Sequence, residues 1–267
     1  MKRVFLTGAS SGIGAAINRL LLEQGCEIWG TSRHPEKLPA HAQFHPIQLD
    51  LRDRGNVENA FASALEQAGR FDVMINNAGS GHFGSAEHLS ANDVGDQFQV
   101  LFFAHVRLMQ LVLASMQPRG AGLIINVTSL AARLPVPFMG AYNAAKAAMA
   151  SFTMSMQLEV GGSGVRIVDL QPADIRTDFN NAVAKTNEDE RDASTIATTW
   201  KLVEKNMNDA PGPEVVARAV LQLIHHSNPP PRITVGGFFQ AHIATIIYRL
   251  LPQRLRIWGL KKYYQLS

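Results

Sequence analysis

The sequence contains little cysteine and no long uninterrupted apolar segment. Cys26 is the only cysteine, which excludes an intramolecular disulfide and leaves no cysteine spacing for a metal cluster. No apolar run reaches the roughly 18 residues expected of a membrane span, and the apolar run after Lys2 and Arg3 is too short for the core of a secretion signal. With 267 residues, 46% of them hydrophobic, the chain can bury a large core. We therefore expect a cytoplasmic protein.

Acidic side chains are absent from the last part of the sequence. No Asp or Glu follows Glu214, whereas seven basic side chains do: Arg218, Arg232, Arg249, Arg254, Arg256, Lys261 and Lys262. A basic tail on a mildly acidic body fits contact with a membrane surface or an anionic partner. It does not fit nucleic-acid binding, which needs a broad basic surface, and the sequence shows no aromatic stacking motif.

Segments typical of strands and of helices alternate along the chain. Strands are predicted at 3–7, 27–32, 44–51, 73–76, 123–129, 165–171 and 232–235. Helices are predicted at 13–24, 57–68, 98–116, 141–159 and 214–227, with a polar stretch at 180–208. This alternation predicts a single α/β domain over residues 1–267, built on a Rossmann-type doubly wound parallel sheet of about seven strands with helices on both faces.

The stretch TGASSGIG, residues 7–14, joins the first predicted strand to the first predicted helix. Gly8 permits a turn with positive φ, Gly12 removes a side chain where the backbone would approach a phosphate, and Gly14 permits close packing of the helix. The helix N-terminus favours an anion. Glycine clusters also occur in plain turns, so this motif alone leaves both interpretations open.

Further landmarks follow in order at the ends of predicted strands or at the start of a helix. They are Asp50, NNAG at 76–79, Ser129 and YNAAK at 142–146. With Thr-Gly-x-x-x-Gly-x-Gly in front, the set resembles the short-chain dehydrogenase/reductase family over about residues 1–177. The resemblance implies an oxidoreductase that interconverts a carbonyl and a secondary alcohol with a nicotinamide dinucleotide.

The resemblance also assigns residues to the dinucleotide. They are Gly8, Ser10, Ser11, Gly12, Ile13, Gly14, Ser32, Arg33, Asp50, Leu51, Asn77, Ala78, Gly79, Tyr142, Lys146, Pro172, Ile175 and Thr177. Asp50 would bind the adenine amine, and Asn77 and Gly79 would line the adenine ribose. Ile175 and Thr177 would contact the nicotinamide carboxamide.

The end of the second predicted strand favours NADP(H) over NAD(H). Ser32 stands where NAD-preferring members of the family have an acidic residue for the ribose 2′-hydroxyl, and Arg33 offers a guanidinium for a 2′-phosphate. Thr31 and Ser32 add hydroxyl groups. The glycine loop, however, lacks the basic residue of many NADP-dependent relatives, and a solvated Arg33 is the alternative.

Ser129, Tyr142 and Lys146 are the predicted catalytic residues. Tyr142 and Lys146 are four residues apart on a predicted helix and therefore share a face. We expect Lys146, together with the oxidised nicotinamide, to lower the pKa of Tyr142 from its usual value near ~10. Tyr142 would then act as general acid or base, while Ser129 binds the substrate oxygen. Substrate contacts are thus assigned to Ser129 and Tyr142, and no metal site is predicted.

Leu101 departs from the family pattern, which has an Asn at this position. In relatives the Asn helps keep a water on the route from the catalytic Lys to solvent, with its backbone carbonyl as acceptor. Leu101 keeps the carbonyl alone, so we expect a slower proton relay. A catalytically weak dinucleotide-binding sensor is therefore an alternative function. Ala173, in place of a family glycine, is a milder departure.

Three segments after predicted strands would surround the substrate, at 80–83, 130–138 and in a lid at about 179–210. The apolar sequence LAARLPVPF at 130–138 favours an apolar substrate, with packing under the lid as an equal alternative. His82 is expected to be solvated, and His225 and His226 are expected to form a surface turn.

An amphipathic basic helix is predicted at about 238–264, with a break at Pro252. It could be a lid or subunit contact, a membrane-surface helix, or a closure of the core. A membrane-associated protein that uses this tail is a second alternative function. The expected partners are a small carbonyl or alcohol substrate, a peripheral membrane contact through the tail, and, by resemblance, further copies in a homodimer or homotetramer.

Overall fold

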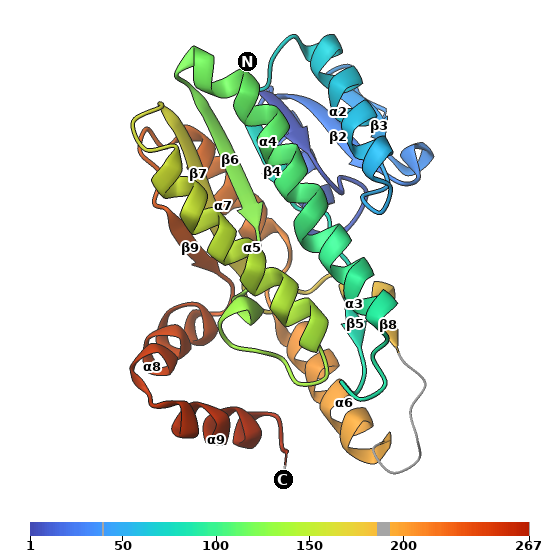
Figure 1. Cartoon of the computed structure of the whole chain (residues 1–267), viewed down its shortest axis with the longest axis vertical. Coiled ribbons are helices and arrows are strands. Elements are labelled where there is room, and N and C mark those ends of the chain that lie inside the picture. The colour runs from blue at the N-terminus through green and yellow to red at the C-terminus, as the bar shows by residue number, and fades with distance from the viewer. Residues whose placement is uncertain (39, 186–192, 267) are drawn as a thin grey trace.

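A seven-stranded sheet forms the centre of the fold (Figure 1). The computed structural model describes residues 1–38, 40–185 and 193–266. All neighbouring strands are parallel, in the order β3-β2-β1-β4-β6-β7-β9. The strands are β1 (Arg3–Leu6), β2 (Glu27–Ser32), β3 (Phe44–Gln48), β4 (Val73–Asn76), β6 (Gly122–Val127), β7 (Val165–Pro172) and β9 (Arg232–Val235). The predicted Rossmann-type sheet is confirmed, and its order reverses at β1 and β4, where such folds bind ligands.

Helices cover both faces of the sheet. On one face, α1 (Gly12–Glu23) and α7 (Glu214–His225) pack on apolar strand residues. On the other face lie α2 (Arg54–Ala68), α4 (Ala104–Met116) and α5 (Gly140–Glu159). Because both faces are covered, the central strands consist of continuous apolar runs such as Val4-Phe5-Leu6, all three of which are fully buried.

The two edge strands differ in sequence. β3 pairs with β2 only, and it contains Pro46 opposite Gly30. On either side of Pro46, the backbone groups of Gln43 and Leu49 hydrogen-bond to β2. Because alternate residues of a strand bond to the same neighbour, the even-numbered Pro46 points its nitrogen away from β2. β9 pairs with β7 only. Short 3-10 segments connect several elements, at Pro35–Lys37, Gln117–Arg119, Leu130–Ala132 and Asp178–Ala182.

One long helix crosses the face opposite α1. It consists of α3 (Ala91–Phe98), a π-helical turn at Gln99–Phe103, and α4. It starts before the predicted residue 98, because Ser90 and Asp93 form a capping box. At 29 residues, Ala91–Arg119 is long and apolar enough to span a membrane by length and composition, although it contains no uninterrupted apolar run of that length. Core helices meet the same criterion, and residues of α4 such as Leu108 and Val112 are fully buried.

The region between β7 and α7 contains more regular structure than the sequence predicts. A two-stranded parallel sheet pairs β5 (His82–Phe83) with β8 (Ala184–Lys185). The predicted polar stretch contains a helix that the sequence did not predict, α6 (Ala193–Asp209), which buries Ile196 and Trp200. The part of the predicted lid at 186–192 lies outside the described residues.

The C-terminal segment forms two helices joined at Pro252. A π-helical turn at Phe239–Ala244 continues into α8 (Thr245–Leu250), and α9 (Gln253–Tyr263) follows the proline. The predicted break is confirmed. In Figure 1 both helices lie near the end of the molecule toward which the strands point, and α6 also lies at that end.

Candidate functional site

The glycine loop has the conformation that its sequence requires. Gly8 and Gly12 have φ values of +69° and +51°. A Cβ atom at Gly14 would lie 1.9 Å from the carbonyl oxygen of Gly8, so only glycine fits there. Ser11, the N-cap of α1, makes no side-chain hydrogen bond to the helix. The first turn of α1 therefore presents backbone N–H groups that suit a phosphate.

Thr7 and Asn77 fix the loop to the end of β4. The Asn77 amide donates to the carbonyl oxygens of Thr7 and Gly8, at 3.0 and 3.2 Å. In return, Thr7 Oγ1 accepts from the backbone N–H groups of Asn77 and Ala78. Asn77 therefore holds the loop as well as lining the predicted ribose position.

Two of the hydroxyl groups at the end of β2 also support the loop. Thr31 Oγ1 accepts from the Gly8 N–H at 3.2 Å, and Ser32 Oγ lies 3.2 Å from Ser10 Oγ. Arg33 is exposed, and Lys37 lines the same cavity. Lys37 was not among the predicted residues, although it lies only four residues beyond Arg33. Arg33 and Lys37 are thus two of the basic side chains at this end of the cavity.

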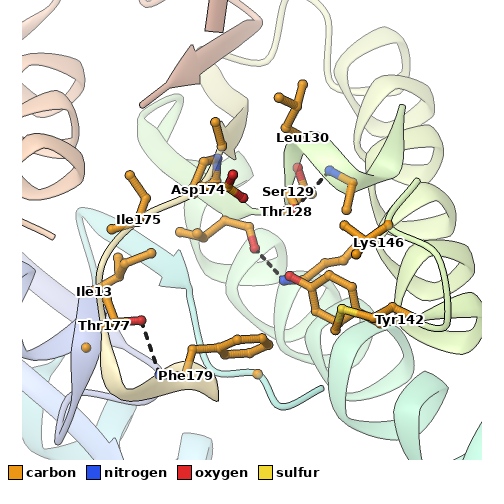
Figure 2. A pocket seen from close by; sticks show the side chains of 18 of the residues that line it. Ile13, Thr128, Ser129, Leu130, Tyr142, Lys146, Asp174, Ile175, Thr177 and Phe179 are labelled. Atoms are coloured by element: carbon orange, nitrogen blue, oxygen red, sulfur yellow. Dashed lines mark hydrogen bonds between the residues drawn. The ribbon is translucent and has the colours of Figure 1, made fainter. Parts of the chain in front are cut away.

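A single cavity of about 760 Å³ brings the predicted residues together. Its lining includes all nineteen predicted catalytic and dinucleotide residues: Gly8, Ser10, Ser11, Gly12, Ile13, Gly14, Ser32, Arg33, Asp50, Leu51, Asn77, Ala78, Gly79, Ser129, Tyr142, Lys146, Pro172, Ile175 and Thr177. Asp50 and Ser129 lie just past β3 and β6, which end earlier than predicted, at Gln48 and Val127. Figure 2 shows the part of this cavity around Tyr142.

Lys146 is buried and oriented by the backbone. Its Nζ donates to the carbonyl oxygen of Val127 at 2.8 Å and lies 5.9 Å from the centre of the Tyr142 ring. Burial lowers the pKa of Lys146 to about 8, and the negative charge of Asp169 opposes this shift. Lys146 thus remains mostly protonated at neutral pH.

The pKa of Tyr142 differs from the sequence prediction. Burial raises it, a hydrogen bond with Ser129 lowers it, and the negative charge of Asp174 raises it further. Among the protein groups, desolvation of the phenolate therefore outweighs the expected lowering. Ser129 also accepts a hydrogen bond from the Ala131 N–H at 3.0 Å, which fixes its side chain.

His105 is a buried residue behind the cavity lining that was not among the predicted residues. Its ring hydrogen-bonds the carbonyl of Leu101, and its Nε2 lies 3.4 Å from Thr7 Oγ1. Burial, reinforced by the charge of Lys146, lowers the pKa of His105 to about 3. The Leu101 carbonyl, predicted to serve a water, is therefore already an acceptor for His105. A lone His in an apolar helix gave no signal of this role.

The C-terminal segment lies over the far end of the cavity. Apolar lining comes from α6, α8, α9 and the turn between the last two: Val203, Met207, Ile247, Leu251, Leu255 and Leu260. This placement is the one that the lid interpretation of the tail requires. Asp174 also lines the cavity, and its position after Pro172 and Ala173 could have marked it.

The remaining histidines lie elsewhere. The side chain of His82 is only 10% exposed, and its Nδ1 lies 3.8 Å from Asp93 Oδ1. The expectation of a solvated side chain is therefore wrong. β5 contains it and packs into the fold. His225 and His226 are exposed at the end of α7, as predicted. Within the described residues, no group of three or more His, Cys, Asp or Glu side chains could hold a metal.

The chain is similar in sequence and in fold to known short-chain dehydrogenases. The family described as short chain dehydrogenase matches residues 2–188. The chain is similar to the 3-ketodihydrosphingosine reductase of Bacteroides thetaiotaomicron, with 30% identity over 264 residues that cover 98% of this chain and 97% of that protein. Among solved structures, a short-chain dehydrogenase from Streptomyces avermitilis has a TM-score of 0.82 and 28% identity, and covers 93% of this chain and 94% of its own.

A further solved structure bears on the cofactor. A serine dehydrogenase complexed with NADP+ has a TM-score of 0.78 and 25% identity, over 90% of this chain and 97% of its own. The glycine loop fits the phosphates of a dinucleotide for two reasons. A Cβ at Gly14 would collide with the loop backbone, and the N-terminus of α1 follows directly after the loop. The chain therefore belongs to the short-chain dehydrogenase/reductase family and is an oxidoreductase that uses a nicotinamide dinucleotide.

Proposed function

We propose that this protein interconverts the carbonyl and the secondary alcohol of an apolar substrate with NADP(H). The observation that carries the proposal is one cavity shared by the glycine loop and by Ser129, Tyr142 and Lys146. The bound cofactor supplies or accepts the hydride. The side chains of the protein hold the substrate and move the proton.

Tyr142 is the proposed proton donor in reduction and acceptor in oxidation. Its raised pKa keeps the phenol protonated at neutral pH, as a donor to a developing alkoxide requires. Lys146 places a positive charge 5.9 Å from the ring centre, which favours the phenolate in the reverse direction. Ser129 would donate to the substrate oxygen and stabilise its developing charge.

The proposed preference for NADP(H) rests on the end of β2 and the residues after it. Ser32 lacks the carboxylate that would repel a 2′-phosphate, and both Arg33 and Lys37 line this end of the cavity. Solved neighbours hold either NADP or NADH, so these side chains are the basis for the preference.

The proposed apolar substrate is supported by the cavity wall. Ile247, Leu251, Leu255 and Leu260 line it from the C-terminal segment, in addition to Leu134 from the 130–138 loop. The relative from Bacteroides thetaiotaomicron is named for a keto substrate, 3-ketodihydrosphingosine. Neither a weak dinucleotide sensor nor a purely membrane-associated protein is favoured by the comparisons.

Loss of reduced-cofactor absorbance tests the proposal. NADPH and NADH would be compared on aldehydes and ketones that range from short polar to long apolar, with wild type and Tyr142→Phe. We expect faster turnover with NADPH and long ketones, and about a 10²- to 10⁴-fold loss in Tyr142→Phe. Undiminished turnover in Tyr142→Phe would contradict the assigned role. Faster turnover with NADH would contradict the role of Arg33, and cofactor binding without any turnover would favour the sensor.

We also propose that the outer face of α8 and α9 contacts an anionic lipid surface. Ile246, Leu250 and Trp258 are 61, 77 and 61% exposed there. Arg249 and Arg254 are exposed between them, and the segment contains no acidic side chain. Exposed apolar side chains interleaved with basic ones are typical of helices that lie on anionic membranes.

A further inference from the structure

Asp174 places a carboxylate beside the apolar side chains with which the C-terminal segment lines the cavity. It follows β7 and lines the same cavity as Ser129 and Tyr142, as Figure 2 shows. The carboxylate is close enough to Tyr142 for its charge to raise the pKa of the phenol. Because Ser129, Tyr142 and Asp174 line one cavity, a ligand that reaches the first two can also reach Asp174.

The observed side-chain partner of Asp174 is neutral. Gln240 Nε2 donates to Asp174 Oδ2 at 2.6 Å, and the Asp174 N–H donates to Gln240 Oε1 at 3.4 Å. None of the ion pairs between described residues includes Asp174. Burial raises the pKa of its carboxyl, and the hydrogen bond from Gln240 opposes the shift. Such a carboxylate is costly to desolvate unless a positive charge joins it.

The cations that line the cavity are engaged elsewhere or lie at the other end. Lys146 donates to the carbonyl of Val127. Arg256 donates to the carbonyls of Leu251 and Arg249, at 2.6 and 3.2 Å. The other basic lining residues, at the dinucleotide end, are Arg33, Lys37 and Arg52. None of these cations forms an ion pair with Asp174, so the cationic group of a ligand is a suitable partner for its carboxylate.

We propose that Asp174, held by Gln240, binds the ammonium group of the substrate. The substrate class is then an amphiphilic amino ketone or the corresponding amino alcohol. Its amine lies next to the reacting carbon, and its apolar chain lies against the side chains of α8 and α9 that line the cavity. This assignment rests on the proposed function, in which Ser129 and Tyr142 hydrogen-bond the oxygen of the substrate carbonyl.

A purely structural role for Asp174 makes a different prediction. The bond between Asp174 and Gln240 also ties the C-terminal segment to the end of β7. Asp174→Asn keeps a side chain that can hydrogen-bond Gln240 but removes the negative charge. If Asp174 only ties the C-terminal segment to β7, Asp174→Asn should leave ligand affinity unchanged or lower it equally for all ligands. If Asp174 binds an ammonium group, the substitution should lower the affinity for amines alone.

Binding of simple probes separates these roles without any turnover. Calorimetry would measure decylamine and decanol on the NADP-loaded full chain, for wild type, Asp174→Asn and Asp174→Glu. The matched control is Asp209→Asn, an exposed carboxylate of α6 outside the cavity lining. We expect decylamine to bind wild type at least about tenfold more tightly than decanol. Asp174→Asn should abolish this preference, while Asp174→Glu and Asp209→Asn should keep it. Equal losses for both probes in Asp174→Asn, or no preference in wild type, would overturn the proposal.

Turnover gives the second readout. The substrates would be 2-aminododecan-3-one and dodecan-3-one, compared by kcat/KM in wild type and Asp174→Asn. We expect the variant to lose at least about tenfold on the amino ketone alone. Turnover of both ketones without an amine preference would overturn the ammonium site and leave the proposed function standing. Selective amine binding without turnover of either ketone would support the ammonium site and overturn the proposed function.

Discussion

His105 shows how one buried residue joins the two halves of the site. Its ring contacts the π-helical turn through the Leu101 carbonyl and the start of the glycine loop through Thr7. Lys146 is close enough for its charge to act on the ring. Since its pKa falls to about 3, His105 is neutral in the native state at any pH near neutrality, with one nitrogen as donor and the other as acceptor.

The depressed pKa of His105 predicts acid sensitivity. Above pH 6.5 the ring is neutral in both states, so it adds no pH dependence. As the pH falls from 6.5 toward 3, the unfolded chain binds a proton that the native state refuses. The free energy of unfolding therefore falls by about 1.4 kcal/mol per pH unit in that window. Urea denaturation at pH 7, 6 and 5 should show about 2 kcal/mol more acid loss in wild type than in His105→Gln. Parallel pH profiles would contradict the assignment.

At the scale of elements, the sequence predicted the sheet and the residues that the structure gathers around the glycine loop in one cavity. Continuous apolar strands and glycines at fixed spacing are local patterns, so they can be recognised without knowing which distant segments pack against them. The helix α6 was missed because its polar composition hides the few apolar residues, such as Ile196 and Trp200, that pack inward. The pKa of Tyr142 and the position of Asp174 depend on which distant segments cover them. No local pattern contains that information.

The junction of the glycine loop with α1 tolerates no side chain at Gly14. A Cβ there would lie 1.9 Å from the Gly8 carbonyl oxygen and 2.6 Å from Asn77 Nδ2. We expect Gly14→Ala to lower the free energy of unfolding by about 1–3 kcal/mol through overpacking. Displacement of the loop should also weaken dinucleotide binding in calorimetry. The matched control is Gly95→Ala in α3, where nothing lies within 4 Å. This change should stabilise the helix by up to about 1 kcal/mol. Similar effects of the two substitutions would show that the loop is more adaptable than its geometry indicates.

At the scale of the whole molecule, the two sides of the C-terminal helices face different surroundings. One side lines the cavity, and the other exposes apolar and basic side chains. An apolar substrate could then pass from a lipid surface to the cavity across a short distance. The proposed lipid contact would place the end of the sheet with the cavity nearest the membrane.

Cosedimentation with vesicles tests this orientation. We expect binding to vesicles of three parts phosphatidylcholine to one part phosphatidylglycerol, weakened by 0.5 M salt through screening. The double change Leu250→Glu and Trp258→Glu should abolish it, because it removes apolar area and adds two negative charges that the anionic lipids repel. Leu158→Glu, at an 81% exposed site near the end of α5, should leave it intact. If the double variant instead dissociates an oligomer and vesicle binding never occurs, the face joins copies of the chain.

The edge strands carry a consequence for how the sheet can grow. At β3, Pro46 turns a ring without an N–H group toward the outside, so an incoming strand finds no donor there. At β9, Pro231 and Val235 bond inward to β7, which leaves the backbone of Arg232 and Thr234 directed outward. Extension of the sheet by another chain, whether as ordered assembly or as aggregation, is therefore less favourable at β3 than at β9.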